Sequence, residues 1–448
     1  MRVESISYII YNNRRKGAGA ASAGSRGRDS PAALLSAPEK WERDDVNMDT
    51  RLWKNEDYWV SSYNFDPETV AGHHISNNLK IHDATLRDGE QTPGVVLRKE
   101  EKVRIAQLLD EAGVHRIEAG MPAVSDEDKL AIAEIKRRGP RAEIFGFVRA
   151  MESDLILCKE CGVDGIVLEV PIGRPKLELQ FKWDIRRVID SSVASIRKAR
   201  ELGLKVIYFP YDTTRADEGD LDLLLDALQG DARPDAIGLV DTMGCALPGA
   251  VATMMRYIKE RTGGLPIEIH THNDFGLAVA GTLQAVLCGA DAVHCCVNGL
   301  GERTGNCSLE EIVCVIQILL AKDLGIDLTK LQGISDYVAE KSGIPVMRNK
   351  PIVGKDIFAR ESGIGADTLF SAPLAMFALN PALLGKEPRL ILGKKSGMLS
   401  IGKKLELLGV TLSDDQKRAL LGDVKALGIQ KERALTDEEF LALLRNYQ

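Results

Sequence analysis

The sequence predicts an α/β fold in which a (β/α)₈ TIM barrel is followed by a linker and a small helical C-terminal subdomain. Between residues 79 and 325, eight short runs rich in apolar and β-branched residues alternate with segments of helical periodicity. Several helical segments end in a glycine after the last apolar position, as helices with a left-handed C-cap do. The 448 residues exceed the ~250 of a typical barrel. The length therefore leaves room for accessory segments.

Eight strands and the helices between them can be assigned in order. The candidate strands are Leu79–Ala84, His115–Gly120, Glu143–Arg149, Gly165–Pro171, Lys205–Tyr211, Ala236–Thr242, Pro266–His272 and Ala292–Gly299. Candidate helices include Lys99–Ala112, Ile185–Leu202, Pro248–Arg261 and Leu309–Leu324. A doubly wound open sheet is the alternative, but no Gly-rich phosphate turn follows the first strand as that fold requires.

Five segments are expected along the chain. They are a disordered tail at 1–47, a lead segment at 48–78, the catalytic barrel at 79–325, a linker at 326–400 and a helical subdomain at 401–448. The tail is rich in Gly, Ala, Ser and Arg and has no apolar period. A native start at Met48 is an alternative to such a tail. The last segment carries helix-capping signals at 411–414 and 435–438.

Composition narrows the class of protein. A net charge of −7 and a pI near 5.7 give no reason to expect nucleic acid or an anionic membrane as a partner. No apolar run has the length that spanning a bilayer requires. Eight cysteines in a chain of this length do not form a disulfide framework. We therefore expect reduced thiols and a cytoplasmic location.

The polar motifs of the barrel segment fall where strands end, and barrel enzymes place their active sites at the C-terminal ends of their strands. The sharpest motif is His270-Thr271-His272-Asn273-Asp274, which closes the seventh strand. Side chains two residues apart on a strand share a face, so His270 and His272 can bind one metal ion. The structural alternative is a pair of hydrogen-bonded core histidines.

Two further motifs close the first and last strands. Within Asp83–Gln91, one carboxylate is expected to complete the metal site while Arg87 faces a developing oxyanion. A solvated loop of salt bridges is the alternative there. In the glycine-rich run 298–306, the amide oxygen of Asn306 is a candidate fourth ligand. Glu169 and Asp241 lie at other strand ends, and for each of them a structural role and a functional role are weighed equally.

Together these motifs resemble the acyl-CoA-condensing branch of the metallolyase barrels, which includes isopropylmalate, homocitrate and citramalate synthases. The resemblance covers residues 79–397. It rests on D-x-T-L-R-D-G-E-Q at 83–91, H-x-H-N-D-x-G-L-A at 270–278 and N-G-x-G-E-R-x-G-N at 298–306. It implies a metal-dependent acyltransferase in which the enolate of acetyl-CoA attacks a 2-oxo acid, and thioester hydrolysis then releases CoA. It also implies a homodimer whose linker crosses to the partner's active site.

The resemblance assigns roles to individual residues. It implies that Asp88, His270, His272 and Asn306 bind the metal ion. We expect Mn²⁺, with Mg²⁺, Co²⁺ and Zn²⁺ as alternatives that accept the same carboxylate and imidazole ligands. The implied substrate and pocket residues are Arg87, Gln91, Thr242, Glu118 and Arg149.

Two departures from the family pattern bear on the chemistry. The family has Glu-Asp where this chain has Tyr211-Asp212, which leaves Tyr211, Asp212 and Glu118 as candidates for the base. In the linker, Arg360 replaces a histidine of the pattern F-A-H-E-S-G-I-H. Arginine pairs bidentately with carboxylates and phosphorus oxyanions, so Arg360 favours an acceptor with an additional negative group.

These departures, with two further stretches of sequence, predict which 2-oxo acid is the acceptor. The stretches 59–65 and 211–215 resemble those of (Re)-type citrate synthases and 2-phosphinomethylmalate synthases, which predicts oxaloacetate or a phosphinate or phosphonate counterpart such as phosphinopyruvate. Homocitrate, isopropylmalate and citramalate synthases are alternatives. A retro-Claisen acyl-CoA lyase is more distant, because the 298–306 loop lacks the Gly-Gly-Cys-Pro sequence expected of it. A biotin-linked carboxyltransferase would need a lysine ligand that is not evident.

Overall fold

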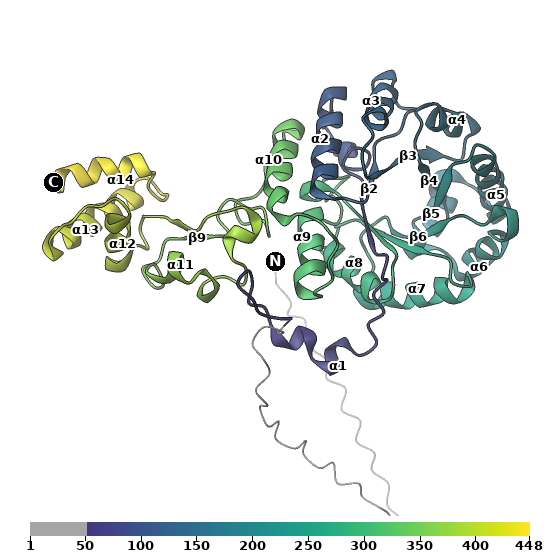
Figure 1. Cartoon of the computed structure of the whole chain (residues 1–448). Coiled ribbons are helices and arrows are strands. Elements are labelled where there is room, and N and C mark those ends of the chain that lie inside the picture. The colour runs from purple at the N-terminus through teal and green to yellow at the C-terminus, as the bar shows by residue number, and fades with distance from the viewer. Residues whose placement is uncertain (1–51) are drawn as a thin grey trace, which may run out of the picture. The chain divides into compact units, whose positions relative to one another are not determined.

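The computed structural model describes residues 52–448, so the expected tail at 1–47 and the alternative start at Met48 lie outside the described residues. Eight parallel strands close into a barrel in chain order, with the last strand paired to the first. Helices surround this ring of strands (Figure 1). The predicted (β/α)₈ fold is confirmed.

The strands and helices of the barrel alternate strictly. The strands are β1 (Lys80–Asp83), β2 (Arg116–Glu118), β3 (Glu143–Arg149), β4 (Gly165–Pro171), β5 (Lys205–Tyr211), β6 (Ala236–Asp241), β7 (Ile267–Thr271) and β8 (Ala292–Cys295). The helices that follow them in turn are α2 (Lys99–Ala112), α3 (Asp126–Arg137), α4 (Glu152–Glu160), α5 (Ile185–Glu201), α6 (Glu218–Ala227), α7 (Pro248–Arg261), α8 (Ala278–Leu287) and α9 (Leu309–Cys314). A short helix, α1 (Pro67–Val70), precedes the barrel.

Most elements agree with the predicted bounds to within two residues at each end, but two elements end well before the predicted residue. Strand β8 was expected to reach Gly299, but residues 297–299 form a 3₁₀ turn in which Asn298 has a φ of 59°. The Asn298 side chain is held there by hydrogen bonds to Ser335, which lies beyond the barrel. The last helix was expected to reach Leu324. Its backbone changes to a π-helical turn over Val315–Leu319, and the helical hydrogen bonding ends before Ala321, where φ is 49°.

The inside of the barrel is packed with side chains, as in other barrels of this type. Phenylalanine and aliphatic residues of β3 to β6 form one apolar cluster on this inner surface. The opposite part of this inner surface carries a column of polar side chains, all of them buried except Arg116, which is partly exposed. In order, the column contains Arg87, Glu118, His82, His294, Glu268 and Arg116.

Close contacts join the members of this polar column. The two imidazoles stack with their centroids 4.0 Å apart. His294 Nε2 lies 2.7 Å from Glu268 Oε2, and Arg116 donates to Glu268 at 2.6 Å. At the other end, His82 Nε2 lies 3.7 Å from Glu118 Oε2. The charges of two arginines and two glutamates therefore balance along the column.

The chain after the barrel is largely irregular before it becomes helical. The elements of this part are α10 (Leu331–Ser342), β9 (Ala359–Arg360), α11 (Thr368–Ser371), β10 (Arg389–Leu390), α12 (Met398–Leu407), α13 (Asp414–Gln430) and α14 (Asp437–Leu444). Capping boxes at Ser413 and Thr436 begin α13 and α14, inside the two signals found in the sequence. These last helices have an apolar core of their own, which includes Leu405, Leu420 and Phe440.

The cysteines and the apolar helices bear on two general expectations. All eight cysteines are free thiols. Across residues 52–448, no helix is both long enough and apolar enough to cross a bilayer.

Candidate active site

Three candidate metal ligands lie at the C-terminal ends of β1 and β7. His270 Nε2 is 3.1 Å from Asp88 Oδ2, and His272 Nε2 is 3.7 Å from the same oxygen. The two imidazole Nε2 atoms are 3.4 Å apart. Between the histidines, Thr271 points the other way and contacts Thr282 of α8. The alternation of β7 therefore directs both imidazoles to Asp88.

These three side chains fit a divalent ion. Ligands ~2.1 Å from a common ion are separated by roughly 3.0–3.4 Å in octahedral or tetrahedral geometry, which is close to the separations observed. Both carboxylate oxygens of Asp88 are buried and accept no hydrogen bond within the described chain. Arg87 lies 3.4 Å from Oδ2 as an ion-pair partner, but buried oxygens without hydrogen bonds are costly, and a divalent ion would satisfy them.

The protonation of the three groups also suits a cation. Burial raises the pKa of Asp88, but Arg87 and the two histidines outweigh burial and hold the pKa below its ordinary value. Burial lowers the pKa of His272 to about 4, and it lowers the pKa of His270 as well. At neutral pH the site therefore presents an ionised carboxylate and two neutral imidazoles, the forms that bind metals.

Asn306 completes this group from the loop after β8. Its backbone forms a bridge with His272, and its Nδ2 donates to the Leu300 carbonyl at 2.9 Å. This hydrogen bond leaves Oδ1 buried without a partner. The loop requires glycine at 305, where φ is 86° and an added Cβ would overlap the Gly299 carbonyl oxygen. The glycine-rich run thus places a free amide oxygen beside the histidines.

Arg87 lies next to the three ligands and is anchored on several sides. Its Nε donates to Glu118 Oε1 at 2.6 Å, and one terminal nitrogen lies 3.4 Å from both Asp88 Oδ2 and Gln91 Oε1. The guanidinium covers the ring of Phe147 at 4.4 Å. Burial lowers the pKa of Arg87, but Glu118 and Asp88 outweigh it and raise the pKa above its ordinary value. A permanent cation is therefore held at the edge of the metal group.

These groups open onto a cavity of about 160 Å³. Gln91, Thr242 and Tyr211 line it, as predicted, together with Arg87 and three of the candidate ligands. The Thr242 hydroxyl accepts a hydrogen bond from the Asp212 backbone N–H at 2.9 Å. Burial raises the pKa of the Tyr211 phenol, which stays protonated at neutral pH.

The structure does not bring every predicted residue into this cavity. Arg149 is half exposed and forms a two-point ion pair with Asp154, at 2.8 and 3.1 Å. Asp212 is buried outside the cavity lining, and Arg215 binds both of its carboxylate oxygens. Arg360 lies on β9 in the linker and is also absent from the lining. Its Nε is buried without a hydrogen-bond partner among the described residues.

The cavity also contains residues to which the sequence analysis gave no role. Phe147, Phe209 and Val240 supply apolar walls, and Glu169 and Glu302 supply two more carboxylates. Phe147, Glu169 and Phe209 share a face with other inward residues of their strands, so strand alternation could have placed them at the site. Glu302 lies in the 298–306 motif, but its direction depends on the fold of that loop.

A second group of potential ligands lies deeper in the barrel, within the polar column. His82, Glu118 and His294 bring ligand atoms within 4.8 Å of one another. The imidazoles of His82 and His294 are stacked face to face, however. Burial lowers the pKa of His82, and His294, Arg116 and Arg87 lower it further. Two neighbouring cations disfavour a divalent ion there. We therefore assign this group to the structure of the barrel.

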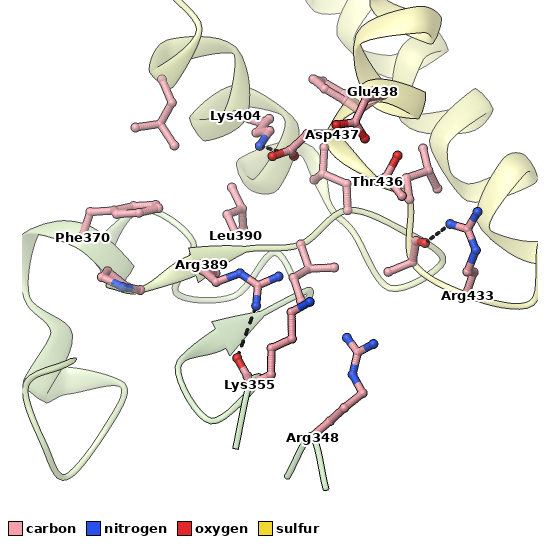
Figure 2. A pocket seen from close by; sticks show the side chains of 17 residues that line it. Arg348, Lys355, Phe370, Arg389, Leu390, Lys404, Arg433, Thr436, Asp437 and Glu438 are labelled. Atoms are coloured by element: carbon pink, nitrogen blue, oxygen red, sulfur yellow. Dashed lines mark hydrogen bonds and ion pairs between the residues drawn. The ribbon is translucent and has the colours of Figure 1, made fainter. Parts of the chain in front are cut away.

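A larger cavity, about 670 Å³, lies between the linker and the C-terminal helices (Figure 2). Its walls carry five cationic side chains, but most of these are already paired. Arg433 pairs with Glu439 and Lys404 with Asp437, each at distances of 2.7–2.9 Å. None of the predicted site residues lines this cavity. The chemistry therefore belongs to the smaller cavity at the barrel mouth.

Comparisons with known proteins show which family the chain resembles. Residues 78–338 match the family model described as HMGL-like, and residues 352–432 match the model described as homocitrate synthase post-HMGL domain-like. The chain is 37% identical over 365 residues to 2-isopropylmalate synthase 2 of Caldanaerobacter subterraneus subsp. tengcongensis, covering 81% of this chain and 94% of that protein.

Other relatives are named as synthases of different products. The chain is 37% identical to homocitrate synthase AksA of Methanocaldococcus jannaschii, over 81% of this chain and 89% of that one. It is 38% identical to (R)-citramalate synthase CimA of the same organism, over 82% of this chain and 74% of that one. A solved hydroxymethylglutaryl-CoA lyase from Pseudomonas aeruginosa shares the fold, with a TM-score of 0.55 and 18% identity over 61% of this chain and 95% of that one.

Proposed function

Because the chain belongs to the HMGL-like family, we propose that it condenses acetyl-CoA with a 2-oxo acid and releases a 2-hydroxy acid and CoA. The observation that carries this proposal is the buried, unsatisfied Asp88 beside His270 and His272, with the permanent cation of Arg87 against it. The relatives named above are synthases for 2-isopropylmalate, homocitrate and citramalate. Their shared chemistry supports an acyltransferase.

Asp88, His270, His272 and Asn306 would hold the divalent ion, for which Mn²⁺ is our first choice. When bound, the ion supplies Lewis-acid polarisation of the keto group. Arg87 is positioned to stabilise the oxyanion that develops as the new carbon–carbon bond forms. Its contacts with Glu118 and Asp88 fix the guanidinium before the reaction, so little reorganisation is required.

We propose oxaloacetate, or a phosphinate or phosphonate counterpart such as phosphinopyruvate, as the acceptor. Arg87 is the only cationic side chain that lines the described cavity, so a second negative group on the acceptor needs a cation from elsewhere. Arg360 is the candidate, since its buried Nε has no hydrogen-bond partner within residues 52–448. The proposal therefore includes a homodimer in which the linker of one subunit reaches the cavity of the other.

The apolar walls favour a second candidate acceptor. Phe147, Phe209 and Val240 would contact the side chain of the 2-oxo acid, and Glu169 and Glu302 would repel an added carboxylate. These residues suit a small monocarboxylate such as pyruvate or 2-oxoisovalerate. The product would then be citramalate or 2-isopropylmalate.

A thiol-release assay tests the proposal. Purified enzyme is given acetyl-CoA and each of oxaloacetate, phosphinopyruvate, pyruvate, 2-oxoisovalerate and 2-oxoglutarate, before and after removal of metal by chelation. We expect metal-dependent CoA release that is fastest with oxaloacetate or phosphinopyruvate. Preference for pyruvate or 2-oxoisovalerate would select the second candidate. Undiminished CoA release after proven metal removal would refute the metal role.

The crossing linker can be tested by mixing two variants. We expect both His272→Ala and Arg360→Ala to be inactive, because each lacks one component of the site. In a homodimer with shared sites, a heterodimer places both lesions in one site and leaves the other intact. A 1:1 mixture that exchanges subunits should therefore recover about a quarter of wild-type activity. No recovery in a mixture shown to contain heterodimers would contradict the crossing.

A further inference from the structure

The residues first considered as the base are occupied by other contacts. Glu118 is not among the residues that line the cavity, and its Oε1 is bound to Arg87 at 2.6 Å, while both Asp212 oxygens are bound by Arg215. Tyr211 lines the cavity, but its raised pKa keeps the phenol protonated at neutral pH. None of the three offers a free, ionised oxygen to the cavity.

Glu169 differs from all of these groups. Its side chain lines the cavity together with Arg87, Asp88 and the two histidines. Within the described part of the chain it forms no hydrogen bond and no ion pair. Glu302 also lines the cavity, but its side chain is half exposed and lies 3.5 Å from Arg303. Glu169 is therefore the unpaired carboxylate on the inner wall.

The strand register places Glu169 on the inner surface of the barrel. Glu169 pairs with Phe209 of β5, and Pro171 pairs with Tyr211. Inward positions on β4 alternate, and Val167 belongs to the inner apolar cluster two residues before Glu169. Glu169 therefore lies one inward position deeper in the barrel than Tyr211.

We infer that the Glu169 carboxylate is the base that removes a proton from the acetyl-CoA methyl group, an assignment that rests on the proposed function. The methyl C–H bond breaks, its proton passes to Glu169, and the electron pair forms the enolate. The enolate carbon then bonds to the keto carbon, whose oxygen becomes an alkoxide beside Arg87. Transfer of the proton from Glu169 to this oxygen restores the carboxylate.

The electrostatics of the cavity are consistent with this role. Burial raises the pKa of Glu169 to about 7, Arg87 opposes this change, and Asp88, Glu118 and Glu302 add to it. A general base works best when its pKa lies near the working pH, because it is then both ionised and sufficiently basic. Glu169 is also a stronger base than an exposed glutamate, whose pKa is ~4.3.

The test compares Glu169→Gln with wild-type enzyme and with Glu178→Gln. Glu178 is an exposed glutamate outside the cavity, paired with Arg174, so its variant controls for loss of a carboxylate from the same region. In Glu169→Gln we expect kcat for CoA release with oxaloacetate to fall 10²- to 10⁴-fold. Metal content and the calorimetric Kd for oxaloacetate should stay within about threefold of wild type or tighten, because a repulsive charge is removed.

Chemical rescue distinguishes a base from a structural residue. Added formate should restore activity to Glu169→Ala by about tenfold or more, because a small carboxylate can occupy the space and accept the proton. If Glu169→Gln keeps kcat within about threefold of wild type, or if formate fails to rescue Glu169→Ala, the assignment is wrong. If wild-type enzyme releases no CoA with any acceptor of the panel, the condensation itself is refuted and the base with it.

Discussion

Replacing Glu118 by glutamine should damage both stability and turnover. Glu118 Oε1 receives the Arg87 Nε hydrogen bond at 2.6 Å, and the side chains of Glu118 and Arg87 are 0% and 8% exposed. Breaking a buried ion pair by removing one partner costs ~3–5 kcal/mol. Arg87 keeps Asp88 and Gln91 as neighbours, and the glutamine amide can still accept a hydrogen bond. We therefore expect a loss near the lower limit, ~3 kcal/mol.

The effect on turnover has a separate origin. Without the carboxylate, the Arg87 guanidinium is free to shift toward Asp88. A displacement of ~1 Å in a catalytic group can cost ~10²-fold in rate. We expect kcat for CoA release to fall by about that factor, while urea unfolding reports the lost stability.

Glu268→Gln provides a matched control within the same barrel. Glu268 is also buried and binds Arg116 at 2.6 Å, but it lies at the opposite end of the polar column from the cavity. Arg116 retains Glu143 at 3.0 Å. Glu268→Gln should therefore lower stability by up to ~3 kcal/mol and leave kcat within about threefold. If both variants lost turnover equally, general loosening rather than Arg87 placement would explain the result. A Glu118→Gln protein with wild-type stability and kcat would refute the reasoning altogether.

Three further outcomes are expected. His272→Ala should retain less than about a tenth of the wild-type metal by elemental analysis, because the remaining ligands hold the ion weakly; full occupancy would remove His272 from the site. Gly305→Ala should lower metal affinity by about tenfold or more, because the added Cβ displaces Asn306. Gly264 has a similar positive φ but open space around it, so Gly264→Ala should leave metal binding unchanged. The base must be ionised to accept a proton, and the pKa of Glu169 is about 7. We therefore expect log(kcat/KM) to rise with pH up to about 7 and then to level off. A profile that is flat from pH 5 to 8 would contradict this assignment.

Local signals explain which elements the sequence predicted well. The helices at 99–112 and 248–261 were predicted to the residue, because Gly113 ends the first and Pro248 begins the second. Strand β8 was predicted four residues too long, because its end depends on hydrogen bonds between Asn298 and the distant Ser335. Contacts of this kind cannot be inferred from periodicity.

Among the site residues too, some could be placed from their neighbours in the sequence, whereas others depend on contacts with residues far away in the chain. Alternation along β7 was sufficient to predict that His270 and His272 point the same way. Whether a strand-end charge faces a substrate or an internal partner depends on residues elsewhere in the fold. Arg149 is held by Asp154, whereas Glu169 has no such partner. In the sequence, both residues are simply polar groups at strand ends, and no local signal distinguishes their roles.

The polar column inside the barrel restricts how this enzyme can be recombined with its relatives. Its members come from β1, β2, β7 and β8, so the column closes across the seam where the first strand meets the last. A chimera that joins one half-barrel to a half from a protein with an apolar interior would separate Arg116 of β2 from Glu268 of β7, so either half would carry one charge of the column without its counterpart. Exchange of the sector from β3 to β6 would leave the column intact. That sector also carries the apolar cavity walls Phe147, Phe209 and Val240 together with Glu169, so its exchange would replace the proposed acceptor contacts and the proposed base at once.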